Sequence, residues 1–245
     1  MNLSSRGIPV VFVLIITMST GLPRSYPRWF LQQSKTGCPD LVVGYSRSFK
    51  NRDSSVDYAF RNGCVNYIRQ KHTFISGGQA FWDTEIGAFW LGSDIEETFD
   101  TARVEPAMEH LKVVDTFYSD HMTAVLLSPS ECRISSTMKS RQGLSGKKTP
   151  SWVSRLPKDG RYEYALGVAQ SYYYEPSSWL EAERSARKSL AGALFSIVRS
   201  LEKQAEQYSA VVDESLSVHL ANIEVVERWR ETGSGIYYVL IRMPR

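Results

Sequence analysis

The sequence predicts an α+β fold, a two-layer α/β arrangement of two tandem copies of a strand–long helix–strand–strand domain, each with its helix packed on a small sheet. Three observations predict it: an internal repeat of constant spacing, an apolar stripe of helical period and two β-rich segments near the C-terminus. The 245 residues, 42% hydrophobic and 22% charged, exclude disordered and polytopic membrane proteins. The net charge of +3 gives no strong field for nucleic acid.

The repeat relates residues that lie 123 positions apart. A second matched block, LKVVDTFYSDHMTAVLLS against NIEVVERWRETGSGIYYVLIR, follows in the same order at a slightly smaller spacing. We interpret the two blocks as a tandem duplication, with a first copy at 22–127, a basic Ser/Gly linker at 128–150 and a second copy at 151–245. The pairs at constant spacing are Trp29 and Trp152, Gly37 and Gly160, Gly44 and Gly167, Ser54 and Ser177, Ala59 and Ala182, and Arg61 and Arg184.

Residues 1–21 have the order of a Sec-type signal peptide. Arg6 precedes a predominantly apolar run at 8–18, and small residues follow. The run is shorter than the roughly 20 residues of a bilayer-spanning helix, although an uncleaved N-terminal anchor is the alternative. No cysteine lies near the expected cleavage point, so no lipid anchor is predicted. We expect an exported protein, periplasmic or secreted, that is peripheral to a membrane at most.

The second copy shows the pattern of the unit most clearly. Tyr162–Tyr173 predicts a strand in which Gly167 marks a bulge or a close backbone approach. Ser178 and Glu181 match a capping box, and a helix of roughly 30 residues follows. The apolar stripe consists of Ala182, Ala186, Leu190, Leu194, Ile197, Leu201, Ala205 and Tyr208. The expected solvent-facing positions are Glu181, Arg184, Arg187, Lys188, Glu202 and Lys203.

Two more strands complete each copy. In the second copy they are expected at Ile223–Arg230 and Ile236–Met243, joined by a Thr-Gly-Ser-Gly hairpin loop. The first copy has a weaker helix, at about Ser55–Lys71, and an additional aromatic stretch, FISGGQAFWDTEIGAFWLG. That stretch predicts either an inserted hairpin or an exposed interaction surface, with core packing as the favoured alternative. The candidate interaction residues are Phe81, Trp82, Phe89 and Trp90.

The three cysteines, Cys38, Cys64 and Cys132, leave at least one thiol unpaired within the chain. A bridge between Cys38 and Cys64 is one pairing, although Cys64 falls within a predicted helix. Burial of all three as small apolar side chains is the favoured interpretation.

The second copy resembles the domain of the LPP-twenty family of bacterial envelope lipoproteins. The resemblance rests on Trp152 with Pro157, on Tyr164–Ala169, on an A-x3-A-x3-L helix pattern, and on the V-V-E-R-W and Y-Y-V-L-I segments. The first copy keeps the tryptophan, the V-V-G and V-V-D-T-F segments and one alanine, but lacks the proline. The resemblance implies an α/β domain with a long helix on a sheet, a cell-envelope location and, in some similar proteins, a place in flagellar rings. It carries no catalytic residues, and this chain lacks the family's usual lipid-modified cysteine.

No catalytic, cofactor-binding or metal-ligating set is predicted, and no cofactor is expected. None of the four histidines pairs with another at metal-ligand spacing; His72 is expected near a helix end and His121 in a turn. The acidic run that contains Asp94, Glu96, Glu97 and Asp100 suits acid–base chemistry or a hard cation, although a helix start explains it better. GLSGKKT lacks the first glycine and the final Ser/Thr of a phosphate loop.

Nucleic-acid binding is not expected. Basic residues of the linker and the adjacent Tyr172–Tyr174 resemble a single-strand-binding composition, but export and a solvated linker account for them better. The sequence therefore favours an exported envelope protein with a structural or protein-binding role, associated with the outer membrane or a flagellar ring, whose partners are envelope proteins or other copies of itself. The alternative is a small-ligand-binding protein or a hydrolase that uses a cleft between the copies, with Asp94, Glu96, Glu97 and His121 as its candidate residues.

Overall fold

The computed structural model describes residues 24–84, 87–93, 95–144, 147–205 and 214–245, without the side chains of 78–93 and 197–216. The signal peptide predicted at 1–21 lies outside the described residues. The elements are β1 (Ser25–Pro27), α1 (Arg28–Leu31), η1 (Gln33–Thr36), β2 (Val42–Ser46), α2 (Arg52–Lys71), β3 (His72–Thr84), β4 (Gly87–Ser93), β5 (Glu96–Thr98), η2 (Thr101–Arg103), α3 (Val104–His110), β6 (Lys112–Tyr118), β7 (Thr123–Ser128), α4 (Ser136–Lys139), β8 (Arg141–Gly143), η3 (Ser151–Val153), β9 (Tyr162–Ala169), α5 (Glu175–Ala205), β10 (Glu214–Ala221), β11 (Glu224–Arg230) and β12 (Tyr237–Pro244).

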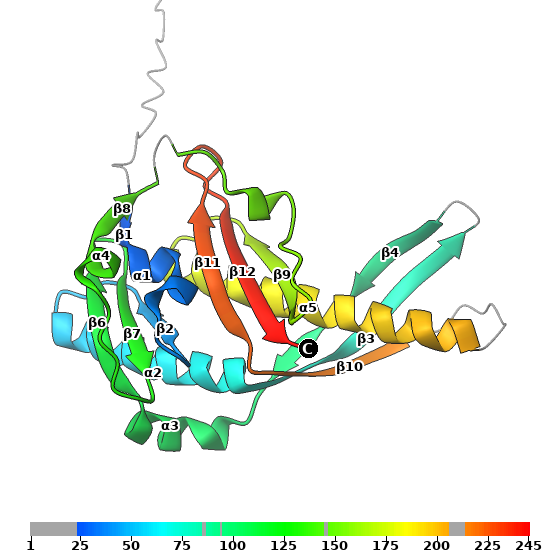
Figure 1. Ribbon diagram of the computed structural model, residues 1–245, viewed down its shortest axis with the longest axis horizontal. Helices are drawn as coiled ribbons and strands as arrows, with labels where there is room; N and C mark the ends of the chain where they lie inside the picture. The colour runs from blue at the N-terminus through cyan, green and yellow to red at the C-terminus, as the bar shows by residue number, and fades with distance from the viewer. Residues whose placement is uncertain (1–23, 85–86, 94, 145–146, 206–213) are drawn as a thin grey trace, which may run out of the picture.

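Two antiparallel three-stranded sheets carry the fold, and they have the same strand order (Figure 1). The first is β2-β7-β6 and the second is β9-β12-β11. Their registers also agree, because Gly44 lies opposite Val125 in the first sheet and Gly167 lies opposite Val239 in the second. Each sheet has an irregularity at the same place, after Val113 in β6 and after Val225 in β11. The predicted α+β class, with a long helix packed against strands, is confirmed.

Each helix approaches its sheet at a strand glycine. A Cβ atom on Gly44 would lie 1.9 Å from the carbonyl oxygen of Ala59 in α2. A Cβ atom on Gly167 would lie 1.9 Å from the carbonyl oxygen of Ala182 in α5. Contact this close leaves no space for any side chain. The close backbone approach predicted at Gly167 is therefore present, and Gly44 makes the same one.

Two further polar contacts recur in both halves. Trp29 Nε1 donates to Asp115 Oδ2 at 2.8 Å, and Trp152 Nε1 donates to Glu227 Oε2 at 2.9 Å. Ser55 Oγ accepts the amide of Phe49, and Ser178 Oγ accepts the amide of Tyr172, both at 2.8 Å. The tryptophan contact ties the segment before each sheet to a sheet strand, and the serine contact fixes the loop that leads into each helix.

The Ser178 contact corrects the predicted capping box. Helix α5 begins at Glu175, so Ser178 lies inside its first turn, where its hydroxyl accepts the Tyr172 amide. Helix α2 likewise begins at Arg52 rather than near Ser55, because the side chain of Asn51 accepts the amides of Asp53 and Ser54. Tyr208, expected at the end of the apolar stripe, lies outside the described residues.

A second sheet system joins the two halves. Strand β10, which the sequence did not predict, pairs antiparallel with β3 over Glu214–Ala221, and β3 continues into a hairpin with β4. The predicted inserted hairpin is therefore present, with Phe81 opposite Trp90 and Trp82 opposite Phe89. In Figure 1, β3, β4, β10 and the C-terminal part of α5 extend away from the two three-stranded sheets.

The segment 128–150, predicted as an exposed linker, is partly built into the core. Ile134, Met138 and Leu144 are buried in the main hydrophobic cluster, and β8 pairs with β1. Three apolar side chains spaced along a polar segment are enough to hold it against the body, even though its composition is that of a linker. Its exposed positions remain polar, which accounts for the composition.

The cysteine interpretation is wrong for two of the three residues. Cys38 and Cys132 form a disulfide with their Cα atoms 6.1 Å apart, which ties the segment before β2 to the segment between the copies. Cys64 is free and buried in α2, as expected. Burial raises the pKa of the Cys64 thiol to about 11.

The core is continuous between the halves. The main cluster contains Tyr26 and Phe30 from the N-terminal segment together with Trp179 of α5 and Tyr237 of β12. Phe30 packs edge-on against Trp179 with ring centroids 5.2 Å apart, and Trp179 packs edge-on against Tyr237 at 4.7 Å. Tyr26 and Phe30, near the N-terminus, therefore pack against Trp179 of the second copy and join the cores of the two copies. Among the described helices, none is both long and apolar enough to cross a membrane.

Candidate functional site

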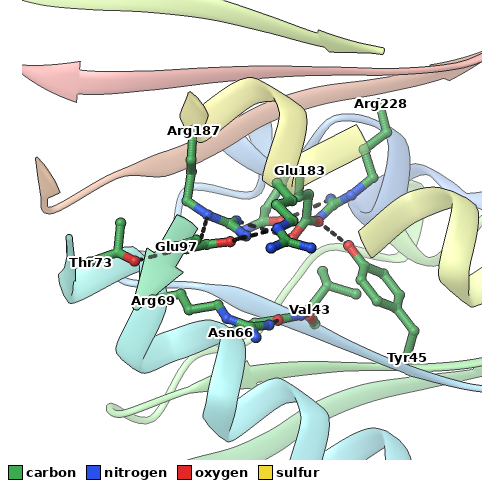
Figure 2. Close-up of polar contacts among 11 residues, drawn as sticks. Val43, Tyr45, Asn66, Arg69, Thr73, Glu97, Glu183, Arg187 and Arg228 are labelled. Atoms are coloured by element: carbon green, nitrogen blue, oxygen red, sulfur yellow. Dashed lines mark hydrogen bonds and ion pairs between the residues drawn. The ribbon is translucent and has the colours of Figure 1, made fainter. Parts of the chain in front are cut away.

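A buried charge cluster, here called the junction network, lies where the two copies meet. It consists of Tyr45 in β2, Arg69 in α2, Glu97 in β5, Glu183 and Arg187 in α5, and Arg228 in β11. Figure 2 shows these side chains pointing toward one another from five different elements. The network therefore forms only where the two copies are in contact, because each copy supplies part of it.

Glu183 is the centre of one half of the network. Arg228 Nη2 donates to its Oε1 at 2.8 Å, Tyr45 Oη donates to the same oxygen, and Arg187 lies 4.0 Å from its Oε2. The other arm of Arg228 donates to the carbonyl oxygen of Phe30 and to Oε1 of Gln33, both at 3.0 Å. Every one of these side chains is almost fully buried, so the carboxylate is held by protein groups in place of water.

Glu97 is the centre of the other half. Arg187 Nε donates to its Oε1 at 2.5 Å and Nη2 donates to its Oε2 at 3.2 Å, the bidentate geometry that planar guanidinium favours. Thr73 Oγ1 lies 3.4 Å from Glu97 Oε1. Arg187, predicted to face solvent, is only 4% exposed, and this prediction is wrong because α5 packs against the first copy on that side.

Burial and charge pairing set the protonation states in the network. Burial alone would raise the pKa of Glu97, but Arg187, Arg69 and Arg184 outweigh it and hold that pKa below its ordinary value. Burial raises the pKa of Tyr45 well above its ordinary value, with Glu183 adding to the effect and Arg228 opposing it. Both groups thus keep one protonation state over the neutral range, Glu97 charged and Tyr45 neutral.

Arg69 is the exception to the pairing. Its guanidinium lies over the ring of Phe99 at 4.6 Å and only 3.5 Å from Oδ1 of Asn66. Burial lowers its pKa, and the nearby Arg187 adds to this, against the opposite effect of Glu97. Arg184 also lies 3.8 Å from Oε2 of Glu97, so the guanidinium groups at this junction outnumber the two carboxylates, Glu97 and Glu183.

A second polar cluster fixes the N-terminal segment to the second copy. Glu175, at the start of α5, accepts from Tyr26 and forms an ion pair with Arg24 at 3.0 Å. Tyr237 accepts from Arg24 Nη1 at 2.9 Å and from Arg230 Nε at 3.1 Å. Burial and Glu175 raise the pKa of Tyr26 well above its ordinary value, so this phenol stays neutral.

An exposed aromatic surface, here called the tyrosine patch, spans the loops that lead into the two helices and the N-terminal part of α2. The Arg47 guanidinium lies 4.8 Å from the ring centre of Phe49 and 5.5 Å from that of Tyr174. Tyr58 packs on Phe49 at 5.2 Å, and Tyr173 packs on Tyr174 at 4.8 Å. The patch comprises Arg47, Phe49, Tyr58, Tyr172, Tyr173 and Tyr174.

The patch is unusual in its exposure. Tyr173 is 93% exposed, Tyr58 is 58% exposed and Tyr172 is 51% exposed. Phe49 and Tyr172 occupy matching positions of the two copies, since the amide of each donates to the matching serine. The two copies therefore contribute equivalent loops to one surface. Tyrosine and arginine are the residue types most enriched at the energetic centres of protein interfaces.

A shallow pocket of about 320 Å³ lies beside the disulfide, between the two copies. The segment 33–41 of the first copy and residues Glu224, Val225 and Arg242 of the second line it. Arg242 is already paired with Glu224, with Nε to Oε2 at 2.7 Å. This pocket contains none of the residues that the sequence offered for a cleft enzyme.

Those residues are placed in different settings. Glu97 is buried in the junction network, Glu96 is exposed on β5 and His121 lies in the bend between β6 and β7, where its amide donates to Ser119 Oγ at 3.3 Å. Asp94 lies outside the described residues. The acidic run is not a helix start, because it forms strand β5; only Asp100 caps a helix, by accepting the Ala102 amide at the start of η2.

The predicted interaction residues Phe81, Trp82, Phe89 and Trp90 have backbones in the β3–β4 hairpin. Their side chains lie outside the described part of the structure. Their proposed role in an interaction surface therefore stays a prediction.

The structure also brings together two histidines that the sequence treated separately. His72 follows α2 directly, as expected, and its ring stacks on that of His219 in β10, with Nδ1 of His72 3.3 Å from Nε2 of His219. Partial desolvation and the neighbouring Arg103, His219 and Lys71 lower the pKa of His72. Within the described ranges no group of three or more metal-ligating side chains occurs.

Sequence reasoning missed the junction network because its members come from distant segments. Glu183 and Arg187 are spaced four residues apart on α5, a spacing that also describes an exposed ion pair. The tyrosine patch had a signal in the run Tyr172–Tyr174, but Arg47 and Phe49 lie more than 120 positions earlier. Neither cluster produces a local motif.

Comparisons with protein-family models, with curated proteins and with solved structures each return no match for this chain.

Proposed function

We propose that this chain is an exported cell-envelope protein that binds another envelope protein through the tyrosine patch, with the two copies acting as one rigid body. The observation that carries the proposal is the tyrosine patch itself, with four exposed tyrosines, the exposed Arg47 and the half-buried Phe49. The patch residues come from both copies, and ring–ring and cation–π contacts link all of them except Tyr172. The signal peptide predicted at 1–21 and the resemblance to LPP-twenty domains support the envelope setting. In its specific form, the proposal is that the partner belongs to an outer-membrane or flagellar-ring assembly.

The rigidity of the body supports the proposal because a preorganised surface binds with less loss of conformational entropy. The junction network, the β3–β10 pairing and the disulfide each cross between distant parts of the chain. The buried carboxylates of both polar clusters are paired with arginine or tyrosine side chains. Their arrangement suits a scaffold, while the patch offers hydrophobic area and hydrogen-bonding groups to a partner.

Site-specific cross-linking in the native cell tests the proposal. A photoreactive amino acid at Tyr173, which is almost fully exposed, is expected to capture one or a few envelope proteins that mass spectrometry identifies. The same amino acid at Leu156, an exposed apolar residue outside the patch, serves as the matched control. Equal capture at both positions, or no capture at Tyr173, contradicts the proposal.

Small-ligand binding in the pocket beside the disulfide is the second candidate, favoured by a pocket whose lining comes from both copies. A thermal-shift screen of sugars, amino acids and small anions tests it. An increase in Tm that is lost in Glu224→Gln supports the pocket as the site. Increases that are unchanged in this variant contradict it.

A further inference from the structure

Two histidines from different copies meet on one face of the sheet that joins those copies. In the β3–β10 register, His72 lies opposite Ala221 and His219 lies opposite Phe74. The two histidines are thus diagonal neighbours, and Nδ1 of His72 is 3.3 Å from Nε2 of His219. We propose that His72 and His219 form a two-ligand site for a divalent transition-metal ion at the junction of the copies.

The separation of the two nitrogen atoms fits a metal centre. Zinc–nitrogen bonds are about 2.0–2.1 Å long, so two nitrogens at tetrahedral positions around one ion are about 3.3–3.4 Å apart. The ligand atoms are therefore already at the spacing that a shared ion needs. Imidazole nitrogen is a ligand that zinc, copper and nickel ions all accept.

Phe74 restrains one of the two rings, because it stacks on His219 with ring centroids 4.6 Å apart. The two imidazole rings are nearly parallel, 5° apart, and the lone pair of each nitrogen lies in its ring plane, so the His72 ring rotates when both nitrogens bind one ion. A ligand ring that is fixed by packing loses less freedom when it binds an ion. Because the site lies on an exposed face, its remaining coordination positions would be open to water or to a ligand from a partner.

The surrounding charges do not block the site. Lys71 and Arg103 are the cationic groups that act on His72. Lys71 pairs with Asp40 at 2.5 Å, and Arg103 pairs with Asp100 at 3.0 Å. These carboxylates offset part of the repulsion that the two cations would exert on a metal ion. A simple hydrogen bond between the two imidazoles is the competing explanation of their contact.

Isothermal titration of the full chain, purified without a histidine tag, tests the site with Zn²⁺, Ni²⁺ or Cu²⁺ alone. The wild-type protein is expected to bind one ion, and His72→Ala and His219→Ala are each expected to weaken that binding by about tenfold or more. His110→Ala and His121→Ala remove the other two histidines and are the matched controls. They should bind as the wild type does.

Proton NMR of the wild-type protein provides a test that depends on no variant. Substoichiometric Ni²⁺ or Cu²⁺ should broaden the ring signals of two histidines together and leave the other two sharp, and His219→Gln should identify the affected pair. The absence of saturable binding by the wild type overturns the proposal. So does wild-type affinity in both His72→Ala and His219→Ala, because the ion would then bind elsewhere.

Discussion

The two copies share a sheet and a helix, yet they cover the outer face of that helix in different ways. In the first copy this face of α2 is apolar: Phe60 and Cys64 pack with Ala107 of α3 in a separate hydrophobic cluster. In the second copy the positions 123 residues later are Glu183 and Arg187, and the first copy covers them. Helix α2 is covered by α3 of its own copy, whereas α5 is covered by residues of the first copy.

This difference explains the asymmetry of the molecule. The first copy gains β4, β5 and α3 between its helix and β6, whereas the second copy passes from β10 to β11 in two residues. The additional β5 also supplies Glu97 to the junction. Charge pairing at the junction is directional, so it defines how the copies meet more strictly than apolar contact would. Divergence in polarity between equivalent helix faces therefore joins the two repeats into one body.

Glu183→Ala is expected to have the largest effect, because it leaves Arg228 and Arg187 buried without their shared carboxylate. Breaking a buried ion pair costs about 3–5 kcal/mol in the free energy of unfolding. Urea unfolding followed by tryptophan fluorescence measures the change. Glu109→Ala, at an exposed glutamate on α3, is the control and should stay within about 0.5 kcal/mol. A decrease of less than about 1 kcal/mol in the free energy of unfolding of Glu183→Ala would show that the network contributes little to stability.

Removal of the disulfide comes next. Cys38 and Cys132 close a loop with a sequence separation of 94, and a disulfide of this kind stabilises by about 2–4 kcal/mol. The double variant Cys38→Ser/Cys132→Ser should therefore have a lower Tm than the wild type, and a reducing agent should lower only the wild-type value. If reduction leaves the wild-type Tm unchanged, the bond contributes nothing to the stability of the folded chain.

Alanine at the strand glycines compares the two copies directly. Gly44→Ala and Gly167→Ala each place a Cβ atom 1.9 Å from a helix carbonyl oxygen, so each should destabilise the protein by about 1–3 kcal/mol or more. Gly192→Ala, in α5 with open space around it, is the control and should stabilise by about 0.5–1 kcal/mol. Denaturant midpoints give the values. A harmless substitution at only one strand glycine would mean that the two copies pack differently.

A pH series tests the paired state of Glu97. Because the pKa of this carboxyl is below its ordinary value of 4.5 in the folded protein, its contribution is fully present above pH 4.5 and is lost as the pH falls through the folded-state pKa. Wild-type stability should therefore decrease below about pH 4.5. Glu97→Gln should be less stable at neutral pH and should have a smaller slope in the acid range. An identical slope in both proteins would assign the acid sensitivity to other carboxyls.

The smallest effect on stability is expected at the tyrosine patch. Tyr173→Ala removes a side chain that is 93% exposed, so the free energy of unfolding should change by less than about 0.5 kcal/mol. Capture of the envelope partner should nevertheless fall sharply. Thermal melts paired with recovery of that partner separate the two effects. Retained recovery with Tyr173→Ala would place the interaction elsewhere on the surface.

The sequence predicted the parts of the fold that depend on local periodicity. The β-branched and aromatic residues of 236–243 identified a strand, and the stripe through Ala182, Ala186 and Leu190 identified a helix. All three stripe residues are fully buried. The spacing of Gly44 and Gly167 pointed to one shared structure. The strand and helix patterns were sufficient because each depends on residues that are close in the sequence, and the glycine spacing was visible because the whole pattern repeats.

The remaining features depend on residues far apart in the sequence. Strand β10 pairs with β3, more than 130 positions away, so its partner could not be identified locally. Arg187 has the spacing of a solvent-facing residue, and only the position of the first copy buries it. The same reason accounts for the Cys38–Cys132 pairing and for the tyrosine patch. Tertiary contact overrides local pattern in each case.

Native-state hydrogen exchange measured by mass spectrometry tests most directly whether the two copies form one cooperative body. The slowest amides of β7 in the first copy and of β12 in the second should report the same free energy of opening in the wild type. In Glu183→Ala the two values should separate, because the junction that couples the copies is broken. Two different free energies in the wild type, unchanged by Glu183→Ala, would contradict the account and show that the copies unfold as independent domains.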